Sequence, residues 1–377
     1  MRMDIALVTT RLTEHDAQGN FTIATASALK SRCDGRVDIY TFAYERPYTG
    51  DIGVHYLSGN NSHSILSNVK AAFNTFRNAR ELSGYDVLLL IGPDIGSIPA
   101  VHLAKRYNPA LKLLWVYHGQ TPAVFLPGIK ERLLMRARKA AYLFSMKRSD
   151  LVQADSEYIS SELSGFGVDP ARIIAMPIGV DISRFSSGKG DMVREKYGIG
   201  GRFLILYVGR LAALKRVDEL IRAVSMMADD ASLIIVGGGP ERPALESLSK
   251  ELNVDGRVKF AGRVGDDELP DYYAACDVWA TASRHEGFCV PIIEAMASEK
   301  PVVVPGVTAM PETAGAAGLV YTPGDLDALA AHIKRLMGDR ELYLSLCRAA
   351  AERASYFEMS TVLSRYVDMV IGLGKGK

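Results

Sequence analysis

Short, nearly continuous apolar runs alternate along the chain with longer segments in which apolar residues recur every three or four positions. The first pattern predicts buried strands of a parallel sheet, and the second predicts amphipathic helices. The apolar runs are residues 4–10, 37–42, 86–91, 111–117 and 150–154, followed by 203–208, 233–236, 258–260, 277–280 and 301–304. Strands that alternate with helices predict a doubly wound α/β fold, in which ligands bind beyond the carboxyl ends of the strands.

The chain has 377 residues, a length that indicates two domains of this kind. A stretch of serine, glycine and lysine, typical of a linker, is found at Ser186-Ser187-Gly188-Lys189-Gly190. The strand pattern begins again after it. We therefore predict an N-terminal domain over residues 1–180 and a second domain over residues 181–356. Apolar side chains at helical spacing predict a final helix within residues 357–377.

The composition argues against several classes of protein. A net charge of +1 produces no overall field that would attract nucleic acid. The four cysteines lie far apart without a metal-binding spacing, so we expect neither a disulfide framework nor a structural zinc site. No apolar run approaches the roughly 18 residues of a membrane span, and the N-terminus lacks a signal-peptide pattern. We therefore expect a cytoplasmic protein.

The most informative stretch begins at Glu286 and ends at Glu294, between a predicted strand and a helix that Pro291 helps to start. Backbone N–H groups from Gly287 to Val290 would lie at the start of this helix, where they favour a phosphate group. The flanking carboxylates would repel phosphate, so we expect them to accept hydrogen bonds from sugar hydroxyls. A phosphate site with a site for sugar hydroxyls on either side indicates that the ligand is a nucleotide-sugar. Glu294 alone could simply complement the helix dipole, and Glu286 alone could be an ordinary surface residue of a loop.

Arg210 and Lys215 follow the predicted strand 203–208. Positive charge is unfavourable beside a helix N-terminus unless an anion lies there, so this pair indicates a diphosphate site. The run Gly237-Gly238-Gly239 lacks the G-x-G-x-x-G order of a dinucleotide-binding loop, and we interpret it as a tight turn. Asp325-Leu326-Asp327 has the form of a metal-binding D-x-D sequence but opens a predicted helix, so we interpret Asp325 as a helix cap.

Two loops of the first domain also follow predicted strands. His118 comes directly after the strand 111–117, and the next residue, Gly119, permits a ligand to approach closely. Gly19 lies between the first strand and a helix predicted from about Phe21. A structural role is the alternative for both residues, and for Gly19 it is as well supported as a ligand-binding role.

Residues 128–150 form a locally basic segment, with seven lysines and arginines against one glutamate between residues 130 and 148. Apolar residues between them recur at roughly helical spacing. A helix with one solvated face explains this pattern. The alternative is docking to anionic lipid headgroups or to a phosphorylated acceptor.

The stretch Glu286-Gly287-Phe288-Cys289-Val290-Pro291-Ile292-Ile293-Glu294-Ala295 resembles the E-x7-E signature of retaining glycosyltransferases of the GT-B fold, family 4. Gly209-Arg210-Leu211, followed by Lys215, is similar to a second motif of that family. Cys289 stands where the family usually has glycine, and it can supply the same N–H if the position does not need a positive φ angle. The resemblance covers nearly the whole chain. It implies two Rossmann-like domains facing a central cleft, with residues 357–377 crossing back onto the first domain.

The resemblance also implies roles for individual residues. His118 and Glu286 would act in catalysis. The residues expected to bind the donor are Gly19, Arg210, Lys215, Arg263, Val264, Gly287, Phe288, Cys289, Val290 and Glu294. Within this set Glu294 would hold the ribose, while Arg210 and Lys215 would stabilise the leaving diphosphate, so we expect neither a metal ion nor another cofactor.

The implied activity is transfer of a sugar from a UDP-, GDP- or ADP-sugar, with retention at the anomeric carbon. The acceptor would be a glycolipid, a polysaccharide precursor or a phosphorylated small molecule, and the basic segment could hold the enzyme at the inner face of a membrane. The alternatives are a nucleotide-sugar epimerase or hydrolase on the same fold, and a non-catalytic nucleotide-sugar-binding protein. Turnover of the donor, as opposed to binding alone, would separate an enzyme from a binding protein.

Overall fold

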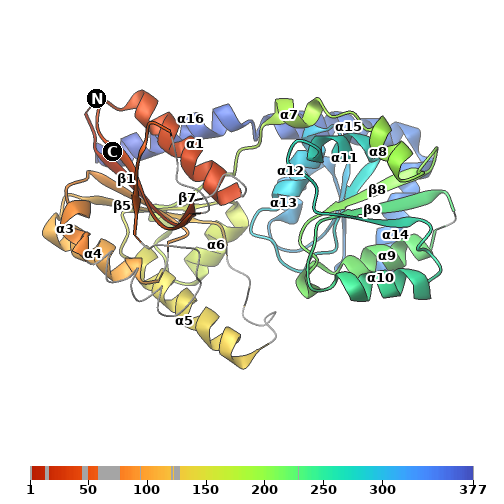
Figure 1. Ribbon diagram of the computed structural model, residues 1–377, viewed down its shortest axis with the longest axis horizontal. Helices are drawn as coiled ribbons and strands as arrows, with labels where there is room; N and C mark the ends of the chain where they lie inside the picture. Colours follow the sequence, from red (N-terminus) through yellow and green to blue (C-terminus); the bar gives the residue numbers. More distant parts are fainter. Residues whose placement is uncertain are drawn as a thin grey trace. The chain divides into compact units, whose positions relative to one another are not determined.

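The computed structural model describes residues 2–12, 17–44, 50–57, 77–93, 95–119, 122, 128–227 and 229–376. The chain divides into two compact units (Figure 1). Unit 1 comprises Met1–Met176 and Val362–Lys377, and unit 2 comprises Pro177–Thr361. Each unit is built on its own parallel sheet with helices on both faces. The prediction of doubly wound α/β domains is therefore confirmed.

Unit 1 contains a seven-stranded sheet in the order β3-β2-β1-β4-β5-β6-β7. Its strands are β1 (Ile5–Leu12), β2 (Val37–Tyr44), β3 (Gly53–Tyr56), β4 (Val87–Ile91), β5 (Lys112–Tyr117), β6 (Leu151–Ala154) and β7 (Ile173–Ala175). Its helices are α1 (Ala17–Arg32), α3 (Ala79–Leu82), α4 (Ser97–Tyr107), α5 (Ile129–Met146), α6 (Glu157–Gly165), the short η2 (Pro170–Arg172) and α16 (Met359–Gly374), which begins in unit 2.

The two faces of the unit 1 sheet are covered by different helices (Figure 1). Ala6 and Val8 of β1 belong to a core shared with α3, α4, α5 and α6. Ile5 and Leu7, which point to the opposite face because side chains alternate along a strand, belong to a core shared with α1 and α16. Burial on both faces explains why the central strands read as continuous apolar runs.

Unit 2 contains a six-stranded sheet in the order β10-β9-β8-β11-β12-β13. Its strands are β8 (Phe203–Val208), β9 (Ala231–Val236), β10 (Val258–Gly262), β11 (Val278–Ala280), β12 (Val302–Pro305) and β13 (Gly318–Tyr321). Its helices are α7 (Ile182–Ser186), α8 (Asp191–Lys196), η3 (Ala213–Lys215), α9 (Val217–Ser225), α10 (Arg242–Glu251), α11 (Leu269–Ala275), α12 (Val290–Ala297), α13 (Met310–Ala314), η4 (Gly315–Ala317), α14 (Leu326–Gly338) and α15 (Arg340–Ser355).

The unit 2 sheet separates two cores in the same way. Leu204 and Leu206 of β8 pack with α7, α8, α11, α12 and α15, whereas Ile205 and Tyr207 pack with α9, α10 and α14. β8 and β11 lie at the centre of the sheet and are parallel neighbours. Their carboxyl ends therefore lie at one edge, which is where ligands of such sheets bind.

Local structure agrees with the sequence in some places and departs from it in others. The predicted cap at Asp325 is confirmed, because its side chain accepts a hydrogen bond from the N–H of Ala328. Ser156 caps α6 in the same way, by accepting from the N–H of Ile159. The first strand is longer than predicted and reaches Leu12, and the first helix begins earlier, at Ala17. Within the described part of the chain, no helix is both long and apolar enough to cross a membrane.

Candidate functional site

The carboxyl edge of the unit 2 sheet brings together two segments that are far apart in the sequence. The loop after β8 contains Arg210 and ends in η3 at Lys215. The loop after β11 contains Glu286 and leads into α12. Because β8 and β11 are adjacent parallel strands, the two loops leave the sheet side by side.

Lys215 and Glu286 form an ion pair between these loops. The Nζ atom of Lys215 donates a hydrogen bond to Oε1 of Glu286. Only 20% of the lysine side chain and 17% of the glutamate side chain are exposed. A charge pair that is partly shielded from water interacts more strongly than an exposed one. The two residues were predicted to bind different parts of a ligand, and in the structure they also contact each other.

A buried carboxylate fastens the two loops to each other. Oε1 of Glu219, in α9, accepts a hydrogen bond from Arg284 at 2.5 Å and another from Arg216 at 3.0 Å. The backbone N–H of Arg284 also donates to the carbonyl oxygen of Leu214 at 2.9 Å. Leu214 and Arg216 are the sequence neighbours of Lys215, and Arg284 lies close to Glu286 in the sequence. These contacts therefore determine where both members of the ion pair lie. Neither Glu219 nor Arg284 was among the residues predicted from the sequence.

The glycine run after β9 supports the loop that carries Arg210. A Cβ atom added at Gly237 would lie 2.0 Å from the carbonyl oxygen of Gly209, and one added at Gly239 would lie 2.1 Å from that of Leu211. The N–H of Leu211 donates to the carbonyl oxygen of Gly238 at 2.9 Å. The glycines are therefore required for close packing between two loops.

The first turn of α12 begins from a strained residue. Cys289 caps this helix with φ of 73°, in the left-handed region. Cysteine could replace glycine here without cost only if the position did not need a positive φ angle. The position does need one, and a non-glycine residue in this conformation costs about 1–2 kcal/mol. Burial is the main cause that raises the pKa of the Cys289 thiol well above its usual value. The thiol is thus uncharged at neutral pH.

Phe288 was expected among the donor-binding residues, but its side chain belongs to the core. It is 5% exposed, and its ring lies 5.8 Å from that of Phe357. The carbonyl oxygen of Phe288 accepts a hydrogen bond from the hydroxyl of Thr313 at 2.8 Å. The neighbouring Gly287 and Val290 are half-buried at the start of the helix.

Glu294 lies one turn into α12 and contacts Tyr273 of α11. The phenol donates a hydrogen bond to Oε2 of Glu294 at 2.6 Å. Burial raises the pKa of Glu294 to about 6, while the hydrogen bond from Tyr273 and the charge of Arg184 act in the opposite direction. Glu294 is therefore mostly ionised at neutral pH but loses its charge in mildly acidic solution.

The remaining predicted donor-binding residues lie at the surface of unit 2. Arg210 and Arg263 are exposed, and within the described residues neither guanidinium group has a salt-bridge partner. The side chain of Arg263 lies over the glycine run, 3.8 Å from a Cβ atom built at Gly238. Val264 is half-buried and packs against the core of unit 2.

In unit 1, His118 has a buried partner that sequence analysis missed. Its Nδ1 atom lies 2.9 Å from Oδ2 of Asp155, a residue that directly follows the neighbouring strand β6. Burial alone lowers the pKa of His118, but the charge of Asp155 and the hydrogen bond to it outweigh this effect and leave the pKa above its usual value. Its Nε2 atom is buried and has no hydrogen-bond partner within the described residues. An acidic residue at the end of an adjacent strand was the signal available in the sequence.

Gly19 does not lie in a loop before a helix. It is the third residue of α1 and is buried, because the helix begins at Ala17. The prediction of a loop glycine at this position is therefore wrong. Nearby, Phe21 of α1 contacts both His118 and Tyr366 of α16 edge to face, at ring distances of 6.1 Å and 5.3 Å.

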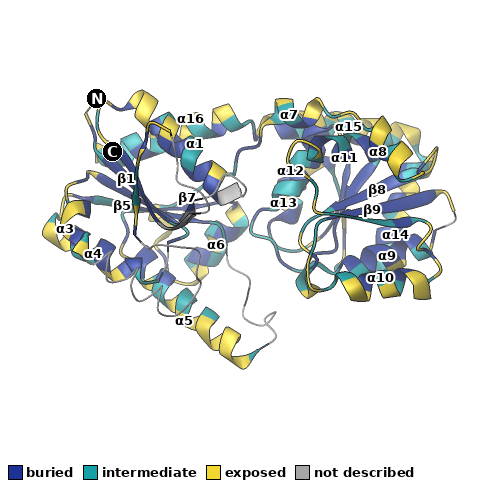
Figure 2. Ribbon diagram, in the orientation of Figure 1, coloured by how far each residue is buried: buried dark blue, intermediate teal, exposed yellow. Residues whose placement is uncertain are grey.

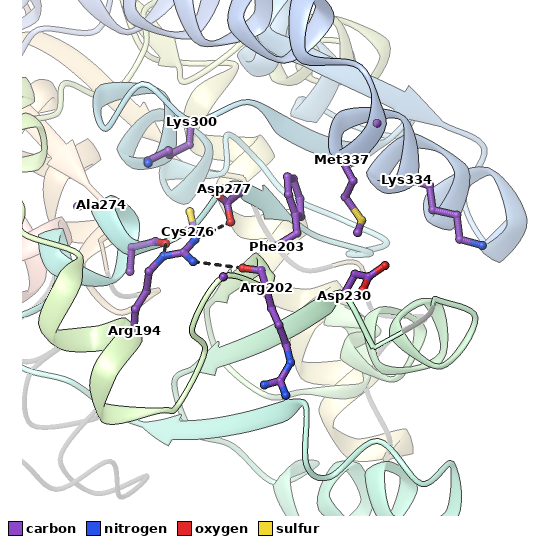
Figure 3. A pocket seen from close by; sticks show the side chains of 13 residues that line it. Arg194, Arg202, Phe203, Asp230, Ala274, Cys276, Asp277, Lys300, Lys334 and Met337 are labelled. Atoms are coloured by element: carbon purple, nitrogen blue, oxygen red, sulfur yellow. Dashed lines mark hydrogen bonds and ion pairs between the residues drawn. The ribbon is translucent and has the colours of Figure 1, made fainter.

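A cavity of about 730 Å³ lies at the opposite edge of the unit 2 sheet (Figure 3). Its lining includes Phe203, the first residue of β8, and Asp277, which precedes β11. Arg194 pairs with Asp277 there at 2.6 Å. Ligands of parallel sheets bind at the carboxyl edge, so this cavity is separate from the candidate site. Among the residues that the structure describes, no group of three or more His, Cys, Asp or Glu side chains is placed to hold a metal ion.

Two family models match the chain, one in each half. The family described as Glycosyltransferase Family 4 matches residues 18–184. The family described as Glycosyl transferases group 1 matches residues 191–353. The second range contains all of the candidate site at the carboxyl edge of unit 2.

Two curated relatives are similar over much of the chain. O-antigen chain mannosyltransferase B of Escherichia coli is 28% identical over 277 residues, which are 66% of this chain and 72% of that protein. The GDP-mannose-dependent alpha-(1-6)-phosphatidylinositol monomannoside mannosyltransferase of Mycobacterium tuberculosis is 29% identical over 239 residues. That match covers 59% of this chain and 62% of the relative, which is less than two thirds of its length.

Solved structures share the fold over the full chain. Sucrose-phosphate synthase of Thermosynechococcus elongatus has a TM-score of 0.81 at 22% identity, with 100% of both chains covered. HepE of Anabaena, in complex with UDP and glucose, has a TM-score of 0.79 at 21% identity and covers 98% of this chain. The match includes 99% of the HepE chain. At these identities the structures show a common fold and no more.

Proposed function

Because the chain belongs to the family 4 glycosyltransferases of the GT-B fold, we propose that it moves a hexose from a nucleotide-diphosphate-sugar to an acceptor hydroxyl with retention at the anomeric carbon. The observation that carries this proposal is the set of groups at the carboxyl edge of unit 2. Arg210, the Lys215–Glu286 pair, the start of α12 and Glu294 converge there. They supply cations and helix N–H groups for a diphosphate, and carboxylates for hydroxyl groups.

The Lys215–Glu286 pair exchanges partners when the donor binds. The ammonium group of Lys215 then turns to the diphosphate, and the carboxylate of Glu286 accepts hydrogen bonds from hydroxyls of the sugar. The ion pair keeps both groups at the site before binding, and the new contacts with the donor must outweigh the free energy that is lost when the pair separates. Glu294, mostly ionised at neutral pH, accepts the two hydroxyls of the ribose.

Catalysis in this scheme consists of stabilising the charge that develops on the departing nucleoside diphosphate. Arg210, Lys215 and the N–H groups at the start of α12 are the donors aimed at that charge. Removal of one preorganised donor of this kind typically costs about 3–4 kcal/mol in the transition state. With these positive groups available, the mechanism assigns no step to a metal ion.

We assign the acceptor to unit 1, where His118 is the group available for hydrogen bonding. Asp155 holds Nδ1 and leaves the buried Nε2 atom for a ligand. A histidine held by a carboxylate keeps a defined ring orientation and a stabilised positive charge. We therefore give His118 the task of orienting a hydroxyl, and Asp155 that of positioning the imidazole.

The names of the relatives suggest which donor and acceptor to try first. One is a GDP-mannose-dependent mannosyltransferase that acts on a phosphatidylinositol monomannoside, and another is an O-antigen chain mannosyltransferase. We therefore propose GDP-mannose as the first donor to test. Glycolipids and polysaccharide precursors are the corresponding acceptors.

Calorimetric titration with GDP-mannose, UDP-glucose and ADP-glucose tests the donor site directly. One of these should bind to the parent protein, and a ligand at 100 times its dissociation constant should add about 2.7 kcal/mol of stability. Lys215→Ala and Arg210→Ala should each weaken binding at least tenfold. Lys250→Ala, which changes an exposed lysine of α10, is the matched control and should leave the affinity unchanged.

No binding of any nucleotide-sugar, or equal binding by all three variants, would overturn the assignment of the site. The stereochemical proposal has its own test, which is proton NMR of the first product formed from an α-linked donor. An α-linked product indicates retention, and a β-linked product contradicts it. Full activity after treatment with EDTA supports a mechanism without a metal ion, and activity restored only by a divalent cation contradicts it.

A further inference from the structure

Much of α5 in unit 1 is exposed (Figure 2), and its exposed residues include large apolar side chains. Ile129, Leu133, Leu134 and Phe144 are 78%, 59%, 63% and 51% exposed. These are among the most exposed large apolar residues of the described chain. Exposed apolar groups that gather on one helix face usually mark a surface that binds another molecule.

Three of these four residues, Ile129, Leu133 and Phe144, belong to one stripe along the helix. Ile129, Leu133, Ala137, Ala140 and Phe144 follow each other at intervals of four, four, three and four residues, so they lie on the same side of the helix. With about 100° of rotation per residue, Lys130 and Leu134 fall on one flank of this stripe, and Arg132 and Arg136 fall on the other. An apolar stripe therefore has basic residues along both sides.

The opposite face of the same helix is anchored in the core. Tyr142 and Met146 are 3% and 1% exposed, and the Tyr142 hydroxyl donates to the carbonyl oxygen of Pro93 at 2.5 Å. The rings of Tyr142 and Trp115 lie 4.9 Å apart. Rotation of α5 could not bury the stripe without removing these contacts, so the fold itself presents the stripe outwards.

Not all basic residues of α5 are available for a partner. Lys139 lies 3.4 Å from the centre of the Phe166 ring and 4.0 Å from Glu162, and Arg138 donates to the Tyr142 hydroxyl at 2.8 Å. Arg148 stacks on Phe144 at 3.7 Å. Lys130 and Arg136 are exposed beside the apolar stripe, and within the described residues no salt bridge of theirs occurs.

We propose that this face of α5 docks on an anionic lipid bilayer. The apolar side chains would enter the boundary between headgroups and acyl chains, and the flanking lysines and arginines would remain at the level of the headgroups. The charge distribution favours a bilayer over an apolar protein groove, since cations on both sides of the stripe would lie against a groove's walls. This inference goes beyond the proposed transfer reaction and does not depend on it.

Co-sedimentation of the full-length protein with lipid vesicles tests the proposal. The parent protein should bind vesicles of phosphatidylglycerol and phosphatidylcholine and should bind phosphatidylcholine alone at least tenfold less. Each basic residue near an anionic surface strengthens binding about fivefold, so the double variant Lys130→Glu with Arg136→Glu should bind at least 25-fold more weakly. Ile129→Ser with Leu133→Ser should lose at least tenfold.

The control variants carry the same changes elsewhere on the exposed surface. Lys250→Glu with Lys334→Glu matches the charge reversal in unit 2, and Met192→Ser removes an apolar side chain that is 76% exposed. Both controls should bind vesicles like the parent. Retained thermal stability of every variant, measured by circular dichroism, ensures that the folded protein is compared.

Several outcomes would overturn the proposal. They are the absence of binding to anionic vesicles, equal binding to both kinds of vesicle, and equal losses in the α5 variants and the controls. A fourth is a parent dimer that becomes monomeric in the Ile129 and Leu133 variant, which would assign the stripe to contact between two copies of the chain. Because vesicle binding requires no nucleotide-sugar, its failure leaves the proposed transfer reaction unaffected.

Discussion

Glu294 shows how the surroundings of one carboxyl group determine when it can act. Burial in the folded protein raises its pKa from 4.5 to about 6, and the hydrogen bond from Tyr273 limits this rise. Between these two pH values the native state holds a proton that the unfolded chain has released, so the stability from this group falls as the pH rises. Binding of the ribose hydroxyls needs the ionised form of Glu294, because only the carboxylate accepts hydrogen bonds from two hydroxyls.

We therefore expect nucleotide affinity to be constant above about pH 7 and to fall about tenfold per pH unit below pH 6. Tyr273→Phe removes a donor that stabilises the carboxylate, so the pH at which affinity begins to fall should move upwards. Isothermal titration between pH 5 and pH 8 measures both effects. Tyr272→Phe is the control, since its hydroxyl contacts Tyr197 instead. A profile that is the same in the parent and in Tyr273→Phe would contradict the role of Glu294.

Cys289 provides a second prediction at the scale of one residue. Its left-handed backbone costs every non-glycine side chain about 1–2 kcal/mol. Cys289→Gly should therefore be more stable than Cys289→Ala by about 1 kcal/mol, although glycine is normally less stable than alanine by 0.5–1 kcal/mol. Urea denaturation measures the difference.

The matched control for this comparison is Cys276, a buried cysteine with φ of −78°. At that position the alanine variant should be the more stable of the two. If glycine were the less stable replacement at both cysteines, the strain inferred for Cys289 would be absent.

At the scale of elements, the candidate site depends on how η3 and α9 are joined to the loop before α12. Glu219 and Arg284 make this connection, and both are partly or fully buried. Glu219→Gln keeps the shape of the side chain but removes the charge from between two arginines. Loss of one member of a buried ion pair costs about 3–5 kcal/mol. We expect destabilisation of this order together with weaker nucleotide binding.

The same substitution in an exposed ion pair separates these effects from a general loss of charge. Arg242 and Glu246 lie 2.7 Å apart with 40% and 41% of their side chains exposed. Glu246→Gln should change stability by no more than about 1 kcal/mol and leave nucleotide affinity unchanged. If Glu219→Gln destabilised the protein but bound nucleotide with parent affinity, the two loops would not depend on this connection for their placement.

Elements also differ in how far the sequence could predict them. Central strands such as β4 were predicted because burial on both faces requires a continuous apolar run. The outer strands β3 and β7 were not, because their residues are only half-buried or exposed and leave no such run. The start of α1 was predicted too late, because the apolar residues used to recognise the helix begin only at Phe21, whereas the helix begins at Ala17.

Some residues of the candidate site could likewise be predicted from the sequence, and others could not. Glu286 and Glu294 stand in one contiguous stretch, so a local pattern was enough to single them out. The partners Glu219, Tyr273 and Asp155 are brought to the site by tertiary folding from positions 21 to 65 residues away in the chain. No local pattern encodes such distances, which is why the contacts appeared only in the structure.

At the scale of the whole molecule, the chain leaves unit 1, forms unit 2 and returns. The sequence placed the change of domain at residue 180 and the return at residue 357, whereas the units divide after Met176 and after Thr361. The reason is a contact between the outgoing and returning segments. The N–H of Val180 donates to Phe357 at 2.8 Å, and the N–H of Met359 donates to Val180 at 3.0 Å, so both segments belong to unit 2 here.

The returning helix α16 then completes the core of unit 1. Val362, Tyr366, Val367 and Val370 are buried, and the last three pack with the strands of that unit. Val367→Asp would place an unpaired charge in this core, at a cost of several kcal/mol. Because each unit has its own core, we expect calorimetry to show a lower unfolding temperature for unit 1. The unfolding temperature of unit 2, which a bound nucleotide raises, should not change. Ser364→Asp, an exposed change in the same helix, should alter neither transition. If Val367→Asp lowered both transitions equally, the two units would unfold as one, and the separate cores would not be independent sources of stability.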